Sequence, residues 1–100
     1  MKYNFDILAS AYRELYNIGE NLLNSSEFAA LKFKESFDKF LDNVSDMPAM
    51  YPKYSDNPKY RKAPLAYDYL AFYQINEKNK TVVIHRILHS KSNIRDFTAN

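Results

Sequence analysis

The chain has 100 residues and a net charge of +2, and 46% of its residues are hydrophobic and 16% aromatic. This length fits one small domain, and the apolar content excludes a chain that is disordered throughout. Cysteine is absent and Gly19 is the single glycine, which excludes disulfides, thiol catalysis and a glycine-rich phosphate loop. No apolar run approaches the ~20 residues of a membrane span, and MKYNFDILAS lacks a signal peptide's apolar core. These features fit a cytoplasmic protein.

The first half of the chain predicts a strand followed by two helices. In KYNFDIL, residues 2–8, apolar side chains alternate, which indicates a strand. A helical stripe then runs from Ser10 to about Leu23, and NSSE at Asn24–Glu27 is a capping signal for a second helix. Lys34 and Asp38 form an i,i+4 pair on the wet side of this second helix. Two helices joined by a few polar residues form a helical hairpin.

The second half predicts a loop and three strands. Three of the four prolines lie between Ser45 and Pro58, which indicates a loop of extended backbone. We expect strands at the three ranges Lys59–Leu65, Tyr67–Asn76 and Thr81–Leu88. Pro64 should lie at an edge, a bulge or a strand end, and NEKN should form a tight hairpin turn. One helical turn is expected around Ile94 and Phe97. We expect residues 1–97 to form a single domain and residues 98–100 to be a frayed tail.

The order strand, helix, helix, strand, strand, strand favours an α+β fold in which one helical hairpin covers one face of one sheet. Tyr69, Ala71, Tyr73 and Ile75 share one face of the middle strand, and Leu70 and Phe72 lie on the other. Apolar residues on both faces predict a central strand that is covered on each side, or covered on one side by a partner.

The charge is divided unevenly along the chain. Residues 1–50 have a net charge of −3, whereas residues 51–100 have a net charge of +5. One interpretation is a solvated surface that arises by chance. The other is a basic face in the second half, suited to phosphate or to an acidic protein surface.

His85 and His89 are the only histidines. On a helix their spacing would suit a shared metal ion, but on a strand four residues span roughly 13 Å, so we expect no metal site and no cofactor. We expect His85 to be a half-buried strand residue. His89, just past the strand end, is interpreted as a hydrogen-bonding residue or a base.

Basic residues gather in two places. In KYRK, Lys59 and Arg61 alternate with Tyr60 and Lys62, which fits either a charge-protected edge strand or a phosphate-facing strand. If the last strand lies near Lys59–Leu65 or crosses the sheet centre, a second set could converge with Arg61, namely Arg86, His89, Lys91 and Arg95. Metal-free RNA cleavage needs a base, an acid and cations on the phosphate, and these side chains could supply them.

Taken in order, ASAYRELYNI, MPAMYP, YLAFYQI and VVIHRILHSKSNI resemble segments of the RelE/ParE superfamily of bacterial type II toxins. The resemblance covers nearly the whole chain. It implies a toxin encoded beside an antitoxin in a plasmid or chromosomal stabilisation module. It also implies a partner, an acidic and partly disordered antitoxin that folds along the toxin surface.

The superfamily has two branches with different targets. RelE-like toxins cleave messenger RNA in the ribosome, and ParE-like toxins inhibit DNA gyrase. Where RelE-like enzymes place an arginine in the central strand, this chain has Leu70, and where they place a C-terminal tyrosine it has Phe97. Lys91 is the nearest match to their basic residue after the last strand. The nuclease residues are therefore depleted, and the ending RILHSK is closer to that of ParE-like toxins.

The expected function is thus a ParE-like toxin that contacts gyrase without enzymatic chemistry. The candidate target- or phosphate-binding residues are Lys59, Arg61, Arg86, Lys91 and Arg95. A RelE-like endoribonuclease is the alternative, and its catalytic residues would be Arg61, Lys62, His89 and Lys91. A second alternative is a degenerate toxin that retains only antitoxin binding.

Overall fold

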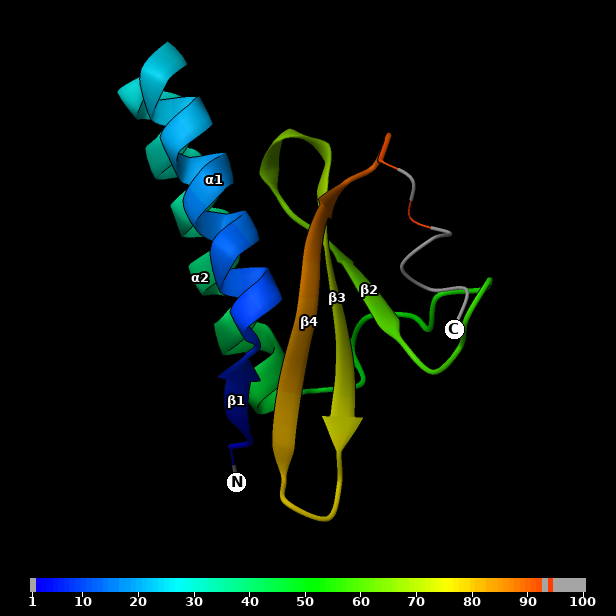
Figure 1. Cartoon of the computed structure of the whole chain (residues 1–100). Helices are drawn as coiled ribbons and strands as arrows, with labels where there is room; N and C mark the ends of the chain where they lie inside the picture. The colour runs from blue at the N-terminus through cyan, green and yellow to red at the C-terminus, as the bar shows by residue number, and fades with distance from the viewer. Residues whose placement is uncertain (1, 93, 95–100) are drawn as a thin grey trace.

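A computed structural model describes residues 2–92 and 94 of the chain. The expected order of elements is confirmed (Figure 1). The elements are β1 (Asn4–Ile7), α1 (Ala9–Ser25), α2 (Glu27–Asp46), β2 (Arg61–Pro64), a 3₁₀ turn (Ala66–Asp68), β3 (Tyr69–Asn76) and β4 (Thr81–His89). Within the described residues, neither helix combines the length and apolar character of a membrane span. Arg95, Phe97 and the expected frayed tail lie outside the described residues.

The four strands form one sheet in the order β1-β4-β3-β2. The predicted antiparallel meander of β2, β3 and β4 is confirmed, and β1 pairs with β4 in the parallel direction, so the sheet is mixed. Both helices lie on the same face of the sheet (Figure 1). The predicted α+β fold, with a helical hairpin on one sheet face, is therefore confirmed.

The core lies between the helices and the sheet. The Ser26 side chain accepts a hydrogen bond from the Ala29 amide, as the capping signal predicted, and so starts α2 directly after α1. The predicted Lys34–Asp38 pair forms on the exposed side of α2 at 2.7 Å. On the inner side the Phe40 ring packs edge-on against Tyr73 of β3, with ring centres 5.6 Å apart.

Several strand boundaries differ from the prediction, and His89, expected just past the strand end, is instead the last residue of β4. β2 begins at Arg61 rather than Lys59, because the Tyr60 backbone bonds to the preceding loop, donating to Asn57 O and accepting from Tyr54 N. Tyr67 was expected in β3, but it lies in the turn before this strand with a φ of 58°. The chain reverses direction there between two antiparallel strands, so Tyr67 cannot remain extended. Pro64 is the last residue of the edge strand β2, as expected.

A β-bulge changes the phase of β4. Phe72 lies opposite Arg86, whereas Tyr73 lies opposite Ile84, so His85 is an extra residue in the ladder. Because of this shift Ile84 and Ile87 both belong to the helix-side core although three positions separate them. We call the opposite side, on which Phe72 lies, the outer face.

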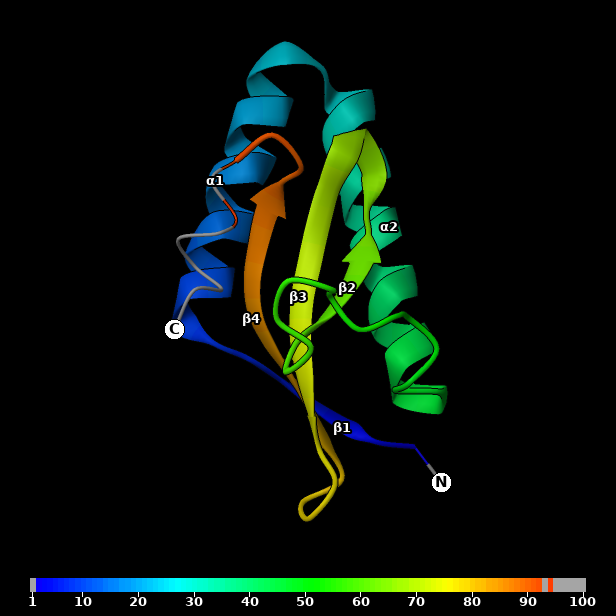
Figure 2. The ribbon, with the colours of Figure 1, turned by 90° about the vertical axis from the view of Figure 1, so that its right-hand side faces the viewer.

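The loop between α2 and β2 partly covers the outer face. Figure 2 shows it crossing in front of β3 on the side away from the helices. The Tyr54 ring meets Phe72 edge-on at 5.5 Å, and Tyr60 meets His85 edge-on at 5.2 Å. The expected cover on both faces of the middle strand is therefore provided in part by the chain itself, and Phe72 is fully buried.

Candidate functional site

The loop after α2 is held in place by side chains that donate to its carbonyl oxygens. The buried Tyr73 hydroxyl donates to Pro48 O at 2.7 Å. Arg61 Nη1 donates to Tyr51 O at 2.7 Å and to Ala49 O at 3.4 Å. Burial raises the pKa of Tyr73 to about 12, so this hydroxyl remains a donor at neutral pH. The MPAMYP segment is thus fixed by two side chains that face the same side of the sheet.

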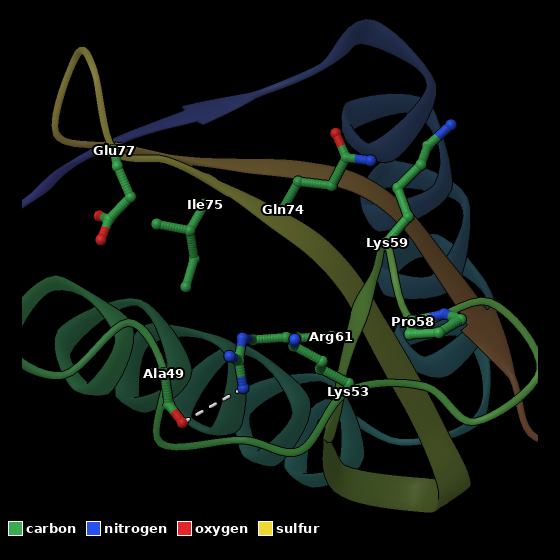
Figure 3. A pocket seen from close by; sticks show the side chains of 8 residues that line it. All are labelled: Ala49, Lys53, Pro58, Lys59, Arg61, Gln74, Ile75 and Glu77. Atoms are coloured by element: carbon green, nitrogen blue, oxygen red, sulfur yellow. Dashed lines mark hydrogen bonds between the residues drawn. The ribbon is translucent and has the colours of Figure 1, made fainter.

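Arg61 is the central cation of an open pocket between this loop and β3. Figure 3 shows its side chain extending across the pocket toward Ala49. One guanidinium nitrogen is occupied by the two loop carbonyls, and among the described residues Nε and Nη2 have no hydrogen-bond acceptor. Since carbonyl oxygens carry no net charge, the positive charge of Arg61 is held in place but is not neutralised. This geometry suits a carboxylate or phosphate ligand.

The rest of the pocket is basic on one side and apolar on the other. Its volume is about 300 Å³, and its lining residues are Ala49, Lys53, Pro58, Lys59, Arg61, Gln74, Ile75 and Glu77. In the part of the chain that the structure describes, neither lysine forms an ion pair. Among the described lining residues Glu77 is the one carboxylate, and it accepts a 2.6 Å hydrogen bond from the Tyr3 hydroxyl.

Lys62 lies on the other side of β2 from Arg61, as the alternation in KYRK predicted. Its Nζ is 5.4 Å from the centre of the Tyr54 ring, and its strand position is level with Phe72. Arg86 lies on the far side of Phe72 in the same register. The outer face therefore brings two predicted cations into one row, separated by a buried aromatic ring.

Arg86 is already paired within the chain. Its Nη2 and Nε donate to the same oxygen of Glu14 at 2.6 and 2.8 Å, and the other Glu14 oxygen accepts from the Ile87 amide at 2.9 Å. The two side chains are 32% and 20% exposed. We expected Arg86 to face an anionic target, but its guanidinium would first have to leave this carboxylate.

His85 is a half-buried strand residue, as expected. Its Nε2 lies 3.0 Å from Gln74 Oε1, so the neutral ring donates through Nε2 when the amide oxygen faces it. Burial and the nearby charge of Lys59 lower the pKa of His85. The ring is therefore neutral at pH 7. No group of three or more potential metal ligands occurs among the described residues.

His89 and Lys91 lie at a different end of the sheet from Arg61. His89 is the last residue of β4, pairs with Tyr69, and accepts a hydrogen bond from the Lys91 amide at 3.2 Å. Arg61 pairs with Tyr73 on the opposite side of β3. Four positions along β3 correspond to roughly 13 Å, to which the spacing of two strand pairs is added. The sheet register therefore does not bring His89 and Lys91 close to Arg61.

Sequence reasoning missed three residues of these sites, Glu14, Lys53 and Gln74. Glu14 had a signal, because it interrupts the buried stripe of α1 between Ala11 and Ile18. A carboxylate in such a position needs a partner. Lys53 and Gln74 had no comparable signal, since the loop conformation brings them to the pocket.

The helical hairpin has a second, apolar groove. It has a volume of about 390 Å³ and is lined mainly by Leu15, Gly19, Ala30, Phe33 and Phe37, with Lys34 and Asp38 at its edge. Tyr16 and Phe28 on the same two helices are 67% and 65% exposed. A Cβ atom at Gly19 would meet no atom within 4 Å, so the glycine leaves an open space in this surface.

Comparison with known families assigns the chain to a protein family. It belongs to the family described as the ParE toxin of the type II toxin–antitoxin system parDE, whose family model matches residues 6–94. The chain is therefore a type II toxin of the RelE/ParE superfamily, as the resemblance of its four segments predicted. No curated protein matches the sequence.

Solved structures with the same fold come from RelE toxins. A mutant of the Escherichia coli toxin RelE in the free state has a TM-score of 0.72 at 20% identity, with 99% of this chain and 95% of that chain covered. The E. coli RelBE toxin–antitoxin complex has a TM-score of 0.67 at 20% identity, with 90% of this chain and 99% of that chain covered. The RelBE2 toxin–antitoxin complex of Mycobacterium tuberculosis has a TM-score of 0.59 at 23% identity, with 89% of this chain and 99% of that chain covered. At these identities the likeness concerns the fold.

Proposed function

We propose that this toxin acts in the ParE-like manner, by binding DNA gyrase and inhibiting it without nuclease chemistry. The observation that carries this proposal is the separation of the basic residues. Arg61 lies beside the loop, Lys62 lies on the outer face, His89 is the last residue of β4, and Lys91 follows that strand. General acid–base cleavage needs its groups within reach of one phosphate. A binding surface needs no such convergence.

The pair Leu70–Leu88 supports the same proposal. Leu70 is the position at which the resemblance to RelE-like enzymes would require an arginine, and its neighbour across the ladder is Leu88. Two leucines side by side cannot bind a phosphate group. They can form the apolar centre of a protein contact, with Lys91 as a candidate cation at its margin; Arg95 stays a candidate on the sequence alone.

The RelE-like alternative rests on Lys62 and on the fold of the solved neighbours. In this alternative Arg61 and Lys62 bind phosphate, and His89 or Lys91 transfers the proton. A degenerate toxin that retains only antitoxin binding is the remaining alternative. Both proposed targets, gyrase and the translating ribosome, are cytoplasmic, so we place the toxin in the cytoplasm and its gene in a plasmid or chromosomal stabilisation module.

Expression of the toxin alone distinguishes the three functions. Gyrase inhibition predicts DNA breaks and filamentous cells, and purified gyrase should lose supercoiling activity when the toxin is added. The RelE-like alternative predicts a stop of translation with codon-positioned cuts in messenger RNA, abolished in Arg61→Ala and Lys91→Ala but not in Lys39→Ala, an exposed control on α2. Translation arrest with intact gyrase activity would overturn the ParE-like proposal. Unimpaired growth would favour the degenerate toxin.

We also propose that an acidic, partly disordered antitoxin covers the apolar groove of the helical hairpin. Two solved neighbours are toxin–antitoxin complexes, and one is a RelE mutant bound to an antitoxin peptide. Tyr16 and Phe28, on the two helices that form the groove, expose apolar surface to water, and a partner segment that folds on binding would cover it.

Gly19 offers a matched test of this contact. Gly19→Ala adds a methyl group where there is open space, whereas Gly19→Trp fills the groove. We expect Gly19→Trp to weaken antitoxin binding by roughly tenfold or more while growth arrest persists, and Gly19→Ala to change binding by about threefold at most. Equal antitoxin binding by both variants would exclude this groove as the docking site.

A further inference from the structure

We propose that the Arg61 pocket binds a carboxylate of an extended acidic peptide segment. The inference rests on the proposed function, because it assigns this segment to the acidic antitoxin. It adds a second contact whose lining residues are distinct from those of the helical groove. Three features of the pocket point to this ligand: the arginine, the charge balance and the neighbouring strand edge.

The first feature is that Arg61 is positioned before any ligand arrives. Its Nη1 is fixed by the carbonyls of Tyr51 and Ala49, while Nε and Nη2 have no acceptor among the described residues. Nε–H and one Nη2–H point in nearly parallel directions in a guanidinium group, and this pair of donors matches the two oxygens of a carboxylate. Little side-chain freedom remains to be lost on binding.

The second feature is an uncompensated positive charge. Lys53 and Lys59 join Arg61 in the lining, and Glu77, the single acid among its described residues, accepts a hydrogen bond from the Tyr3 hydroxyl. In Figure 3 the Lys53 side chain reaches toward Arg61, whereas the Lys59 ammonium group lies away from it at the rim. Arg61 and Lys53 are therefore the cations that a ligand meets inside the pocket.

The third feature is the edge of β3, which favours a peptide over a nucleic acid. β2 pairs with β3 only from Leu70 to Tyr73, because the chain before Arg61 turns away into the loop. In the part of the chain that the structure describes, the next three residues of β3, Gln74–Asn76, thus have no paired strand on that side, and Gln74 and Ile75 line the pocket. An extended peptide can align with such an edge, placing alternate side chains toward Arg61 and toward the apolar walls. Pro58 and Ile75 form walls that a phosphodiester backbone would not contact favourably.

The proposal is tested with the full-length toxin, isotope-labelled by cell-free synthesis so that toxicity does not limit the yield. The probes are a capped peptide of alternating valine and glutamate, the same peptide with glutamine, inorganic phosphate and a short oligothymidylate. We expect the glutamate peptide to bind roughly tenfold more tightly than the glutamine peptide. NMR shifts should concentrate at Arg61 Nε and at the amides of Gln74–Asn76.

Three variants test which side chains bind the peptide. Arg61→Lys retains the charge but loses the paired donors, so we expect roughly tenfold weaker binding. Lys53→Gln, an exposed residue whose change leaves the loop anchors intact, should weaken binding by roughly threefold. Lys32→Gln on α2 is the matched control and should leave binding unchanged. Thermal unfolding of each variant checks that it is folded.

Three outcomes would overturn the inference: no peptide binding, equal binding of the glutamine peptide, or tighter binding of oligothymidylate at the same residues. The last would make the pocket a nucleic-acid site. The proposed function is measured separately, by growth arrest on expression and its relief by the neighbouring antitoxin gene. Arrest and relief that persist in Arg61→Lys, with no peptide binding to the unaltered toxin, would remove the inference and leave the proposed function standing.

Discussion

The two arginines of the sheet, Arg61 and Arg86, differ in what holds them. Arg86 is bound by the Glu14 carboxylate, which also accepts from the Ile87 amide, so its charge is neutralised within the fold. Arg61 is bound by two loop carbonyls, so its position is fixed, but no described residue neutralises its charge. Both were candidate target-binding residues. The comparison teaches that a partner's charge decides whether a well-ordered arginine serves the fold or is available to a ligand.

The regions around the two arginines are built for these different roles. Near Arg86, helix α1 supplies a carboxylate to the end of β4 that β1 does not reach, since β1 pairs only with Thr81–Ile84. Near Arg61, the loop supplies carbonyls and leaves a pocket. We expect changes in the first region to affect stability, and changes in the second to affect binding more than stability.

The largest expected effect is that of Glu14→Gln. It leaves Arg86 without its counter-charge in a partly buried position, so we expect the free energy of unfolding to fall by about 2–3 kcal/mol. Urea denaturation at pH 7 measures this. Glu35→Gln, which removes an exposed 3.6 Å ion pair with Lys32, is the control and should cost about 0.5 kcal/mol or less. Combining Glu14→Gln with Arg86→Met should recover part of the lost stability. If Glu14→Gln alone costs no more stability than Glu35→Gln, the Glu14–Arg86 ion pair does not stabilise the fold.

Tyr73→Phe should have the next largest effect. It removes the donor to Pro48 O, so we expect a loss of about 1–2 kcal/mol at pH 7. The folded pKa of Tyr73 is about 12, above the ordinary value of 10.0. Its stabilising contribution is therefore complete below pH 10 and is lost as the pH rises toward 12, by about 1.4 kcal/mol per pH unit. Denaturation curves from pH 9 to 12 should show this loss in the unaltered chain but not in Tyr73→Phe. Equal pH dependence of the unaltered chain and Tyr73→Phe would contradict the role given to Tyr73. Tyr12→Phe, at an exposed tyrosine, is the control and should keep the pH dependence of the unaltered chain.

Arg61→Met should have a smaller effect on stability than Glu14→Gln. Two carbonyls lose a donor but can bind water at this open pocket, and no opposite charge is left behind, so we expect a loss of about 1 kcal/mol. Chemical denaturation under the conditions used for Glu14→Gln measures this loss of stability. A loss larger than that of Glu14→Gln would reverse the comparison and make Arg61 the structural arginine.

The smallest expected effect is the pH dependence that His85 contributes. Its folded pKa lies below 6.5, so the unfolded chain takes up the proton first, and stability is lost as the pH falls through 6.5. The groups that face the ring are Lys59, Gln74 and Tyr60. Between pH 7 and 5, His85→Phe should lose less stability than the unaltered chain, measured by thermal unfolding. His89 is present in both proteins and cancels in the difference, so an identical loss in both would contradict the prediction.

The order of elements could be predicted from the sequence because it depends on local patterns. The stripe of α1, the cap at Ser26 and the apolar alternation of β3 each lie within a few residues of one another. The site could be predicted only in part. Arg61 and Lys62 were expected on opposite faces of a strand and are found there, but the expected convergence of the cations depended on which strands are neighbours.

The bulge at His85 could not be predicted from the sequence, for a physical reason. In TVVIHRILH a strict alternation would put Ile84 and Ile87 on opposite faces, and the extra residue returns both to the core. The bulge also sets the position of Arg86 relative to the outer face. A single inserted residue changes the face of all that follow it, and no local pattern marks it.

By itself the sequence determined the hairpin of helices, the antiparallel meander and the membership of a toxin superfamily, because periodicity, caps and segment order are written in neighbouring residues. Only the tertiary structure decided which arginine is neutralised. Arg86 and Glu14 are 72 positions apart, and Arg61 meets the loop carbonyls only after the loop folds back along β2. A charged side chain is neutralised only by an opposite charge within a few ångströms, and the packing of the whole chain decides which groups come that close.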